Sequence, residues 1–265
     1  MDNKSIQAAL IKQRLLDPPA DGSWGNQSKL ALKLFQERNN LTTTGEPDSK
    51  ILTLLSVAPE PQIHCGSDFA GRIIKYMLDR GDYVPVGDRL CTIVYTEGCN
   101  ADGSVNTDTQ NQWNDRRIVI EIPDGRPKIV GNWLATSEPG NKYTRAPLNS
   151  LGAFRIAFGQ YKAWRVGIHK DHEALVQCGE VKGYRDSNKD GMRTGDPVVV
   201  GSGFGVNQHW GYDMAQVDGA SAGCLVGQSK AGHREFMALI KQDKRYQASS
   251  GYTFMTAAIA GDKLP

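Results

Sequence analysis

A cysteine and a histidine in one short stretch of the sequence are the residues best suited to covalent chemistry. Residues 221–224 read Ser-Ala-Gly-Cys, and His209 ends the run Gly-Phe-Gly-Val-Asn-Gln-His that precedes them. A cysteine attacks as its thiolate, so it needs a nearby base or a lowered pKa. Backbone N–H groups near Gly223 and Cys224 can stabilise an oxyanion. We therefore take Cys224, His209, Ser221 and Gly223 as candidate catalytic residues; a buried structural cysteine and histidine are the alternative.

An acidic loop is the second pattern that can bind a ligand. In residues 186–196, Asp186, Asn188 and Asp190 alternate and Gly191 follows them, as in calcium loops. The twelfth position is Pro197 instead of the bidentate Glu of a complete loop. Asp and Asn also favour turns through their own hydrogen bonds. Both a weak calcium site and a plain hairpin loop fit this sequence.

Two further histidines end a predicted strand. His169 and His172 are spaced as H-x-x-H, and with a further ligand they would make a zinc site. That spacing on a strand differs from the helical H-E-x-x-H of zinc peptidases. The alternatives are that the pair borders the Cys224 cleft or lies in a solvated loop. We expect no metal and no cofactor in the main reaction.

The first 57 residues show three helical stripes of apolar residues separated by turns. Prolines and glycines break the chain after the first stripe, and Asp48 is the expected N-cap of the third helix. We expect a small three-helix bundle over residues 1–57. A linker and a packing helix should follow over residues 58–89, with an amphipathic helix at residues 67–83.

The pattern changes to strands near residue 90. Residues 116–135 predict a hairpin that turns at Asp124-Gly125. Other strand-like runs cover residues 89–98, 153–161, 164–169, 173–181, 197–209 and 252–260, and one helix is expected at residues 232–243. We therefore expect an α+β chain in which residues 90–265 form one β-rich domain with a sandwich-like or barrel-like core.

The N-terminal segment resembles the peptidoglycan-binding domain of bacterial and phage cell-wall enzymes. Residues 21–55 contain a Gly-x-Trp-Gly loop, a Leu-x-x-Phe-Gln helix and a Thr-Gly-x-x-Asp turn before the last helix. The resemblance covers most of residues 5–57. It implies that the segment binds bacterial peptidoglycan, with Trp24 as a candidate substrate-binding residue. An unrelated three-helix bundle is the alternative.

Residues 203–227 resemble the catalytic signature of the L,D-transpeptidase (YkuD-like) family, in which a Gly-hydrophobic-x-x-His strand precedes Ser-x-Gly-Cys. Residues 146–159 resemble that family's Thr-Pro-x-Gly-x-Phe-x-Ile strand. The resemblance covers roughly residues 130–230. It implies that Cys224 attacks a stem-peptide carbonyl to form a thioester and that His209 takes the thiol proton. It also implies that a backbone carbonyl near Ser221 orients the imidazole.

Two positions depart from the family pattern. Ala222 stands where the family usually has His, and Val226 stands where it often has Arg or Asn. Those side chains would face the donor peptide or the cleft rim, so we expect hydrolysis to outweigh transfer. Near the motif, Ala222, His169, Trp210 and Tyr212 are the candidate substrate-binding residues.

The composition excludes several classes of protein. With 39% hydrophobic and 23% charged residues and a net charge of +2, the chain has no basic block for nucleic acid. No run approaches the ~18 apolar residues of a membrane span. The first residues lack the apolar core of a Sec signal peptide, and the five cysteines show no C-x-x-C spacing, which favours reduced thiols. We expect a monomer made in the cytoplasm that acts at the periplasm or cell wall after release or dedicated secretion.

The leading hypothesis is a peptidoglycan-processing enzyme that acts on stem peptides or cross-links through a cysteine thioester. A binding segment followed by a catalytic domain also occurs in phage endolysins, so we expect a hydrolytic endolysin or effector. Three alternative functions fit the sequence as well. They are an L,D-transpeptidase that forms 3–3 cross-links, a zinc-dependent cell-wall peptidase or amidase, and a non-catalytic wall-binding protein.

Overall fold

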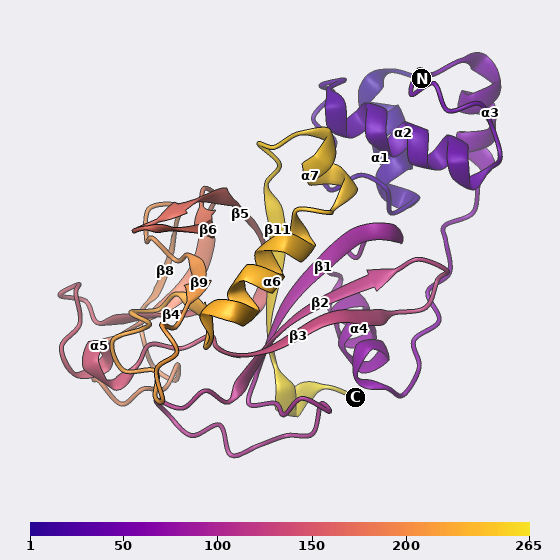
Figure 1. Ribbon diagram of the computed structural model, residues 1–265. Coiled ribbons are helices and arrows are strands. Elements are labelled where there is room, and N and C mark those ends of the chain that lie inside the picture. The colour runs from indigo at the N-terminus through magenta and orange to yellow at the C-terminus, as the bar shows by residue number, and fades with distance from the viewer. The chain divides into compact units, whose positions relative to one another are not determined.

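The computed structural model describes residues 1–265 and confirms a mixed α+β chain (Figure 1). The chain divides into two compact units. The first unit contains Met1–Thr92, Glu121–Lys128 and Lys241–Ser250. The second contains Ile93–Ile120, Ile129–Ile240 and Gly251–Pro265. Each unit is described separately below.

Three N-terminal helices form where the apolar stripes predict them. They are α1 (Asn3–Lys12), α2 (Asn26–Arg38) and α3 (Ser49–Val57). Their apolar faces share one core in which Leu10, Leu32 and Phe35 are fully buried. The Asp48 side chain accepts the Ile51 N–H at 2.8 Å, which confirms the predicted N-cap.

Two buried glutamines hold the loops between these helices. The side-chain amide of Gln7 donates to Asp21 Oδ1 and Ser28 Oγ, and its carbonyl oxygen accepts the Gly22 N–H. Gln36 acts in the same way on the next turn, where its oxygen accepts the Gly45 N–H at 2.8 Å. Since a buried amide must satisfy its hydrogen bonds, each glutamine fixes one loop against the core.

The rest of the first unit includes the amphipathic helix expected at residues 67–83. It forms as α4 (Phe69–Arg80), with Asp68 as N-cap and Gly81 at φ +86° after its last turn. A short helix that the sequence did not indicate, α7 (Lys244–Ala248), also belongs to this unit. Its buried Arg245 forms ion pairs with Asp17 and Asp243.

The β-rich part forms a closed eight-stranded barrel, so of the two expected cores the barrel-like one is present and the sandwich-like one is not. The barrel closes because the first and last strands pair in parallel, with Ile93 opposite Thr256. From Leu90 to Glu97 every residue of β1 is buried, which explains why most of them are apolar. The strand order around the barrel is β1 (Gly87–Glu97), β11 (Phe254–Ala260), β5 (Gly159–His169), β6 (His172–Gln177), β9 (Gln208–Trp210), β10 (Leu225–Gly227), β3 (Lys128–Thr136) and β2 (Asp115–Ile122).

A separate three-stranded sheet has the order β4 (Ala153–Ile156), β7 (Val181–Asp186) and β8 (Val198–Gly201). The run 153–161, predicted as one strand, therefore breaks after Ile156: its first part enters this sheet and its second part enters the barrel. Residues on both sides of the break are apolar, so the hydrophobic pattern does not mark it. This break places Phe154 on a different sheet from the strand that ends at His169.

Other predicted elements are confirmed. Strands β2 and β3 are neighbours joined across Asp124-Gly125, with Gly125 at φ +73°. The helix expected at residues 232–243 forms as α6 (Lys230–Ile240) and buries Phe236 and Ile240. Two short helical segments, α5 (Asn141–Arg145) and the 3-10 turn Gly261–Lys263, were not predicted.

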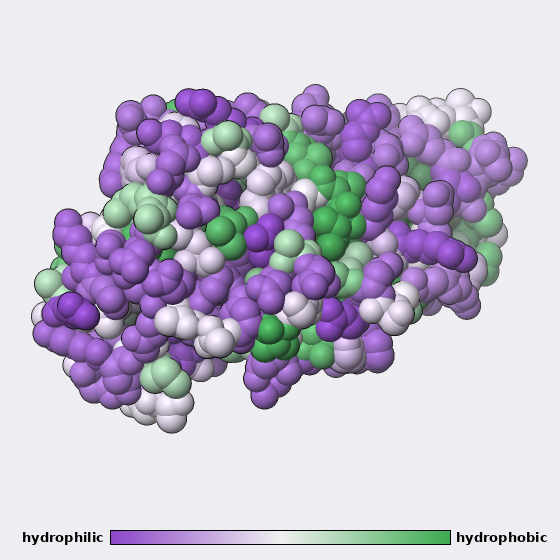
Figure 2. Space-filling model, turned by 60° about the horizontal axis from the view of Figure 1, so that its bottom comes forward, coloured by the Kyte–Doolittle hydropathy of each residue, from purple (hydrophilic) through white to green (hydrophobic).

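The surface in Figure 2 is mainly hydrophilic, with hydrophobic atoms in small areas. Large apolar side chains that are exposed, such as Leu148, Ile168 and Val200, are scattered along the sequence. Exposed single apolar residues are normal for globular proteins. None of the helices combines the length and the apolar character that crossing a membrane requires. None of the five cysteines forms a disulfide.

Candidate active site

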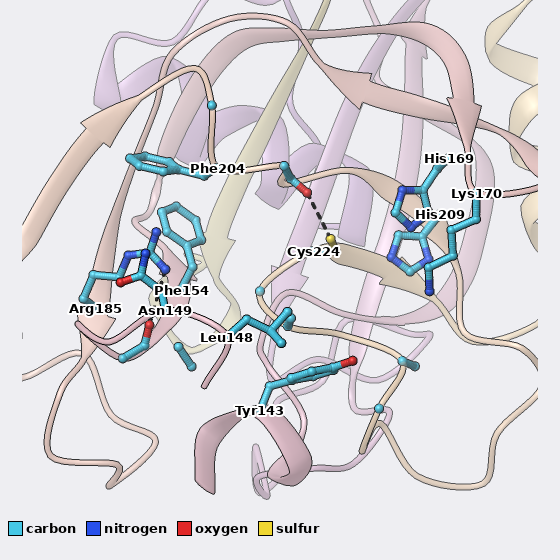
Figure 3. Close-up of a pocket in the computed structure, with 18 residues that line it drawn as sticks. Tyr143, Leu148, Asn149, Phe154, His169, Lys170, Arg185, Phe204, His209 and Cys224 are labelled. Atoms are coloured by element: carbon cyan, nitrogen blue, oxygen red, sulfur yellow. Dashed lines mark hydrogen bonds between the residues drawn. The ribbon is translucent and has the colours of Figure 1, made fainter. Parts of the chain in front are cut away.

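Cys224 and His209 line the same pocket of about 510 Å³ in the second unit. Figure 3 shows Cys224 between two groups of side chains in this pocket. On one side lie three residues that can exchange protons or carry positive charge: His169, Lys170 and His209. On the other side lie Phe154, Phe204 and Arg185. The pocket therefore has a thiol at its centre, imidazoles on one flank and an aromatic-cationic wall on the other.

The turn before Cys224 is held by Ser221, which is fully buried. Its hydroxyl donates to the Cys224 carbonyl at 2.9 Å and accepts the Gly223 N–H at 3.1 Å. Gly223 has φ +117°, and an added Cβ would lie 2.3 Å from the Phe154 carbonyl oxygen. Only glycine fits this close approach in that conformation. Ser221 and Gly223 thus determine how the cysteine is presented.

The Cys224 thiol is half-buried and donates to the Gly205 carbonyl at 3.3 Å. Burial raises its pKa, while an N–H of Asn207 and the charge of Lys170 act in the opposite direction. A raised pKa means that the resting group is the neutral thiol. Nucleophilic attack from this site therefore requires transfer of the thiol proton to a base.

His209 supplies a neutral imidazole from β9. The side chain is 2% exposed, and burial lowers its pKa to about 3. Its Nδ1–H donates to the Trp210 carbonyl at 2.8 Å, which leaves Nε2 as the acceptor. The expectation that a carbonyl near Ser221 orients the imidazole was wrong, because the carbonyl that holds the ring is that of the adjacent residue, Trp210.

A buried arginine that sequence reasoning missed supports the His209 strand. Arg117 on β2 is fully buried and donates to the His209 carbonyl at 2.9 Å and to the Tyr95 hydroxyl. Its remaining nitrogen bonds to His233 Nδ1 at 3.1 Å, and His233 Nε2–H donates to the Glu173 carbonyl. The only signal in the sequence was an arginine within a predicted strand. A charged side chain that becomes buried in a strand requires hydrogen-bond partners.

His169 lies directly against the candidate base. Its ring stacks on the ring of His209 with centroids 4.5 Å apart. The side-chain amide of Asn207 donates to His169 Nδ1 at 2.9 Å. Burial, together with the positive charge of Lys170, lowers the pKa of His169. The structure thus brings His169 to the pocket together with Cys224 and His209.

The other predicted aromatic and histidine residues form a cluster that does not line this pocket. The His172 ring stacks on Trp210 with centroids 3.8 Å apart, and Tyr212 lies edge-on to both. His172 Nδ1 interacts with Asp171 at 3.1 Å. The side-chain clusters spaced closely enough to share a metal ion contain no histidine. This geometry gives no support to a zinc site built on His169 and His172.

The two positions that depart from the family pattern lie in different environments. Ala222 lines the pocket, as expected. Val226 is fully buried in a core with Trp113, Val217 and Ala220, so the expectation that position 226 faces the cleft was wrong. Val226 lies on β10 opposite His209 in the strand ladder, and its side chain points into the core instead.

The wall opposite the histidines is built from residues that the sequence did not indicate. The guanidinium of Arg185 lies over the rings of Phe154 and Phe204, 5.4 and 5.3 Å from their centroids. Lys170, on the histidine side, is the second cation of the pocket. No aspartate or glutamate lines the pocket. This distribution of charge favours a ligand that carries carboxylates.

The remaining predicted residues lie elsewhere. Trp24 is a half-buried residue of the first unit that packs on the N-terminal core, and its indole N–H is buried without a hydrogen-bond partner. Asp186 ends β7, and Asn188 and Asp190 lie in the loop that follows; none of the three lines the pocket.

Comparison with known proteins identifies the N-terminal segment. Residues 2–55 match the family model described as "Putative peptidoglycan binding domain". No curated protein matches the chain. A crystal structure of a fused Zn-dependent amidase/peptidase/peptidoglycan-binding domain-containing protein from Clostridium acetobutylicum is similar at 13% identity, covering 97% of this chain and 94% of the other. Its TM-score is 0.30, so neither the fold nor the reaction is inferred from it.

Proposed function

We propose that this protein processes peptidoglycan and that Cys224 attacks a stem-peptide carbonyl to form a thioester. One observation carries the proposal: Cys224 and the neutral imidazole of His209 line one pocket in a chain whose residues 2–55 match a peptidoglycan-binding family. A binding segment raises the concentration of a tethered active site at an insoluble substrate.

The site holds a neutral thiol and a neutral imidazole at rest, so the attack begins with transfer of the thiol proton to His209. The Trp210 carbonyl holds Nδ1–H of His209, so Nε2 is the atom that accepts the thiol proton. Sulfur then bonds to the substrate carbonyl carbon. As the C–N bond breaks, the protonated imidazole returns its proton to the leaving amine. Before attack the thiol must leave the Gly205 carbonyl, to which it donates at rest.

The oxyanion requires a donor from the same turn. The Gly223 N–H is already bound to Ser221 Oγ, so the Cys224 N–H is the donor we assign to this role. The sequence suggested that N–H groups near both Gly223 and Cys224 stabilise the oxyanion; we assign this role to Cys224 alone. Ser221 acts as a positioning residue, because its hydroxyl holds the Cys224 carbonyl and the Gly223 N–H together.

The pocket suits an acidic peptide. Stem peptides carry free carboxylates, and Lys170 and Arg185 provide two cations at opposite ends of the cavity. The Arg185 guanidinium lies over the rings of Phe154 and Phe204. Its flat face is available to an aliphatic side chain of the substrate, and its edge is available to a carboxylate. We assign the donor peptide to this wall and the leaving amine to the histidine side.

We propose that water is the main acceptor of the acyl group. Ala222 presents only a methyl group to the pocket, where a larger polar side chain would hold an incoming amine. Without an oriented amine, transfer loses its proximity advantage, and bulk water competes by concentration. Since Val226 is buried, this part of the proposal rests on Ala222 alone.

Mass spectrometry of muropeptides tests the proposal. Sacculi incubated with the full-length protein should release shortened or uncrosslinked stem peptides, and iodoacetamide should abolish the change while EDTA should not. A Cys178→Ala variant, which removes a thiol that does not line the pocket, should behave as wild type. Loss of activity in EDTA together with resistance to iodoacetamide would establish metal-dependent chemistry instead. Products dominated by new 3–3 cross-links would make the enzyme a transpeptidase.

A further inference from the structure

The loop after β7 gathers three carboxylates that the proposed chemistry does not use. Oxygens of Asp186, Asp190 and Asp196 all lie within 4.8 Å of one another. Asp186 is fully buried and Asp196 is 9% exposed, whereas Asp190 lies at the surface. Like charges held this closely repel one another, so a positive partner would stabilise the arrangement.

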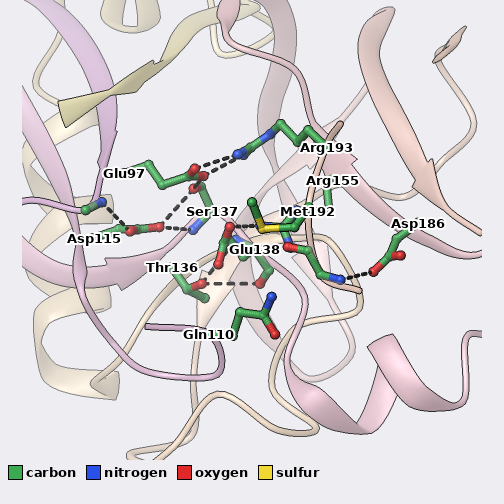
Figure 4. A network of polar contacts seen from close by, with 12 residues as sticks. Glu97, Gln110, Asp115, Thr136, Ser137, Glu138, Arg155, Asp186, Met192 and Arg193 are labelled. Carbon is green, nitrogen blue, oxygen red and sulfur yellow. Dashed lines mark hydrogen bonds and ion pairs between the residues drawn. The ribbon is translucent and has the colours of Figure 1, made fainter. Parts of the chain in front are cut away.

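Two of the buried oxygens lack a hydrogen-bond partner. Asp186 Oδ2 accepts the Gly191 N–H at 3.0 Å (Figure 4), but its Oδ1 accepts from no group. Asp196 repeats this pattern, since Oδ1 accepts the Ser187 N–H at 3.3 Å and Oδ2 has no partner. Buried oxygens of carboxylates are almost always paired, because leaving them unpaired costs free energy. Both side chains therefore offer an oxygen to a ligand at this loop.

A second carboxylate cluster in the same unit shows what a neutralised group looks like. Glu97, Asp108 and Glu138 also lie within 4.8 Å of one another, but Arg193 pairs with Glu97 and Arg155 pairs with Glu138 (Figure 4). The counterions of that cluster are built into the chain.

The loop cluster has no such counterion. Arg155 reaches the loop, but it donates to the Gly191 carbonyl, and no ion pair joins Asp186, Asp190 or Asp196 to a lysine or arginine. The charge of Arg155 acts on Asp186 and Asp196 without an ion pair to either, and the same guanidinium pairs with Glu138. A bound cation would therefore add charge that this arginine does not supply by itself.

We propose that this loop binds a calcium ion through Asp186, Asp190 and Asp196. Calcium takes six to eight oxygen ligands at about 2.3–2.6 Å, so oxygens on opposite sides of the ion lie about 4.6–5.2 Å apart. The three carboxylate oxygens lie at most 4.8 Å apart, which does not exceed that separation, so one ion can contact all three. Water and backbone carbonyls complete the coordination. Mg²⁺ fits less well, because it holds its waters and usually takes only one or two carboxylates.

The ligand set differs from the one that the calcium-loop pattern predicts. Asp196 stands one residue before the position of the expected Glu, so it supplies the last carboxylate in place of Pro197. Asn188 is not a ligand in this arrangement: its side chain donates to Asp190 Oδ2 and accepts the Asp190 N–H.

The loop adjoins a wall of the Cys224 pocket. Asp186 is the last residue of β7 and pairs with Ala153 of β4, and both Ala153 and Arg185 line the pocket. An added Cβ at Gly152 would lie 2.1 Å from the Asp186 carbonyl oxygen, so the two strands are in close contact there. The calcium ion therefore holds the loop at the end of the strand that carries Arg185.

Titration of the full-length protein with CaCl₂ tests this site. Protein treated with EDTA and desalted should bind one Ca²⁺ per chain by calorimetry, with a Kd on the order of 10⁻⁴–10⁻³ M, as for calcium sites with incomplete ligand sets. About 10 mM Ca²⁺ should raise Tm by roughly 3–8 °C, because the ion binds only the folded loop. The same concentration of Mg²⁺ should raise it much less.

Two variants separate a ligand role from a structural one. Asp196→Asn removes one repelling charge, so its Tm without calcium should equal or exceed that of wild type, while the rise with calcium should be lost. Asp190→Asn, at the exposed member of the cluster, should also lose the rise. Asp124→Asn in the exposed hairpin turn is the control and should keep it. The proposal would be overturned by a wild-type Tm that calcium does not change, or by an equal rise with Mg²⁺. A full calcium response in both cluster variants would also overturn it.

Discussion

The N-terminal helices and the Cys224 pocket are built in contrasting ways. The buried residues of the helical core lie between Ile6 and Leu55, apart from Leu90 of β1, so most of this core comes from one continuous segment. The pocket is lined by residues between Tyr143 and Cys224 that come from both the barrel and the three-stranded sheet. The first arrangement follows from local periodicity, whereas the second depends on strand pairing between distant parts of the chain.

The proposed function assigns two different tasks, wall binding and catalysis, to these two regions. A compact helical segment can carry wall binding without strand pairing, which is how a binding domain can be joined to different catalytic domains. A catalytic cysteine must instead be held opposite its base by several elements at once. We therefore expect changes in the pocket to abolish chemistry and leave wall binding intact. Changes in the helices should weaken wall binding and leave chemistry intact.

The largest effect should follow removal of the nucleophile. Cys224→Ala should lower turnover of peptidoglycan by roughly 10⁴-fold or more, because no thioester can form. Its co-sedimentation with sacculi should remain that of wild type. Turnover and pelleting are measured on the same samples, with Cys178→Ala as the matched control. A variant that loses binding together with activity would show that the two regions are not separable.

Removal of the base should have the next largest effect. His209→Asn should lower turnover by roughly 10²–10⁴-fold, since its amide can still donate to the Trp210 carbonyl but cannot take the thiol proton. His172→Asn removes an imidazole of the neighbouring cluster and should retain much more activity. Initial rates on a soluble muropeptide measure both. Equal losses in the two variants would argue against a specific role for His209.

A change in the helical segment should have a smaller effect that depends on the substrate. Trp24→Ala should weaken pelleting with sacculi about tenfold, as expected for loss of one aromatic anchor. Its rate on a soluble muropeptide should not change, because the pocket lies in the other unit. Pelleting as strong as that of wild type, in a variant with native helical circular dichroism, would remove Trp24 from the binding surface.

The smallest effect should be that of mild acid. Burial holds the pKa of His209 at about 3, so the imidazole stays neutral as the pH falls from 7 to 5. The kcat/KM for a soluble muropeptide should therefore be nearly constant over this range. An imidazole with the ordinary pKa of about 6.5 would reduce it roughly 25-fold. A decrease of that size, with folding unchanged by circular dichroism, would mean that His209 is not the base or is not buried during catalysis.

Sequence alone predicted the parts of the molecule that depend on local patterns. The apolar stripes around Leu10 and Phe35, the Asp48 cap and the Asp124-Gly125 turn all follow from residue spacing, and each is present. The α+β class and helix α6 were predicted on the same basis.

Features set by distant contacts were not predicted. Barrel closure depends on β1 pairing with β11, and no residue pattern marks the break between β4 and β5. Arg117, which supports the His209 strand, lies 92 residues before His209 in the sequence. Val226 was misplaced because the sequence does not show whether the strand residue two positions after the cysteine faces the core or the cleft.

Capture of the covalent intermediate tests the central claim most directly. Full-length protein mixed with a soluble muropeptide and quenched in acid should show, by intact mass spectrometry, an adduct equal to the acyl part of the stem peptide. Peptide mapping should place it on Cys224, and hydroxylamine should remove it, as expected for a thioester. Cys224→Ala should show no adduct and no product. Product formation by Cys224→Ala, or by wild type with the acyl group on another residue, would contradict the account.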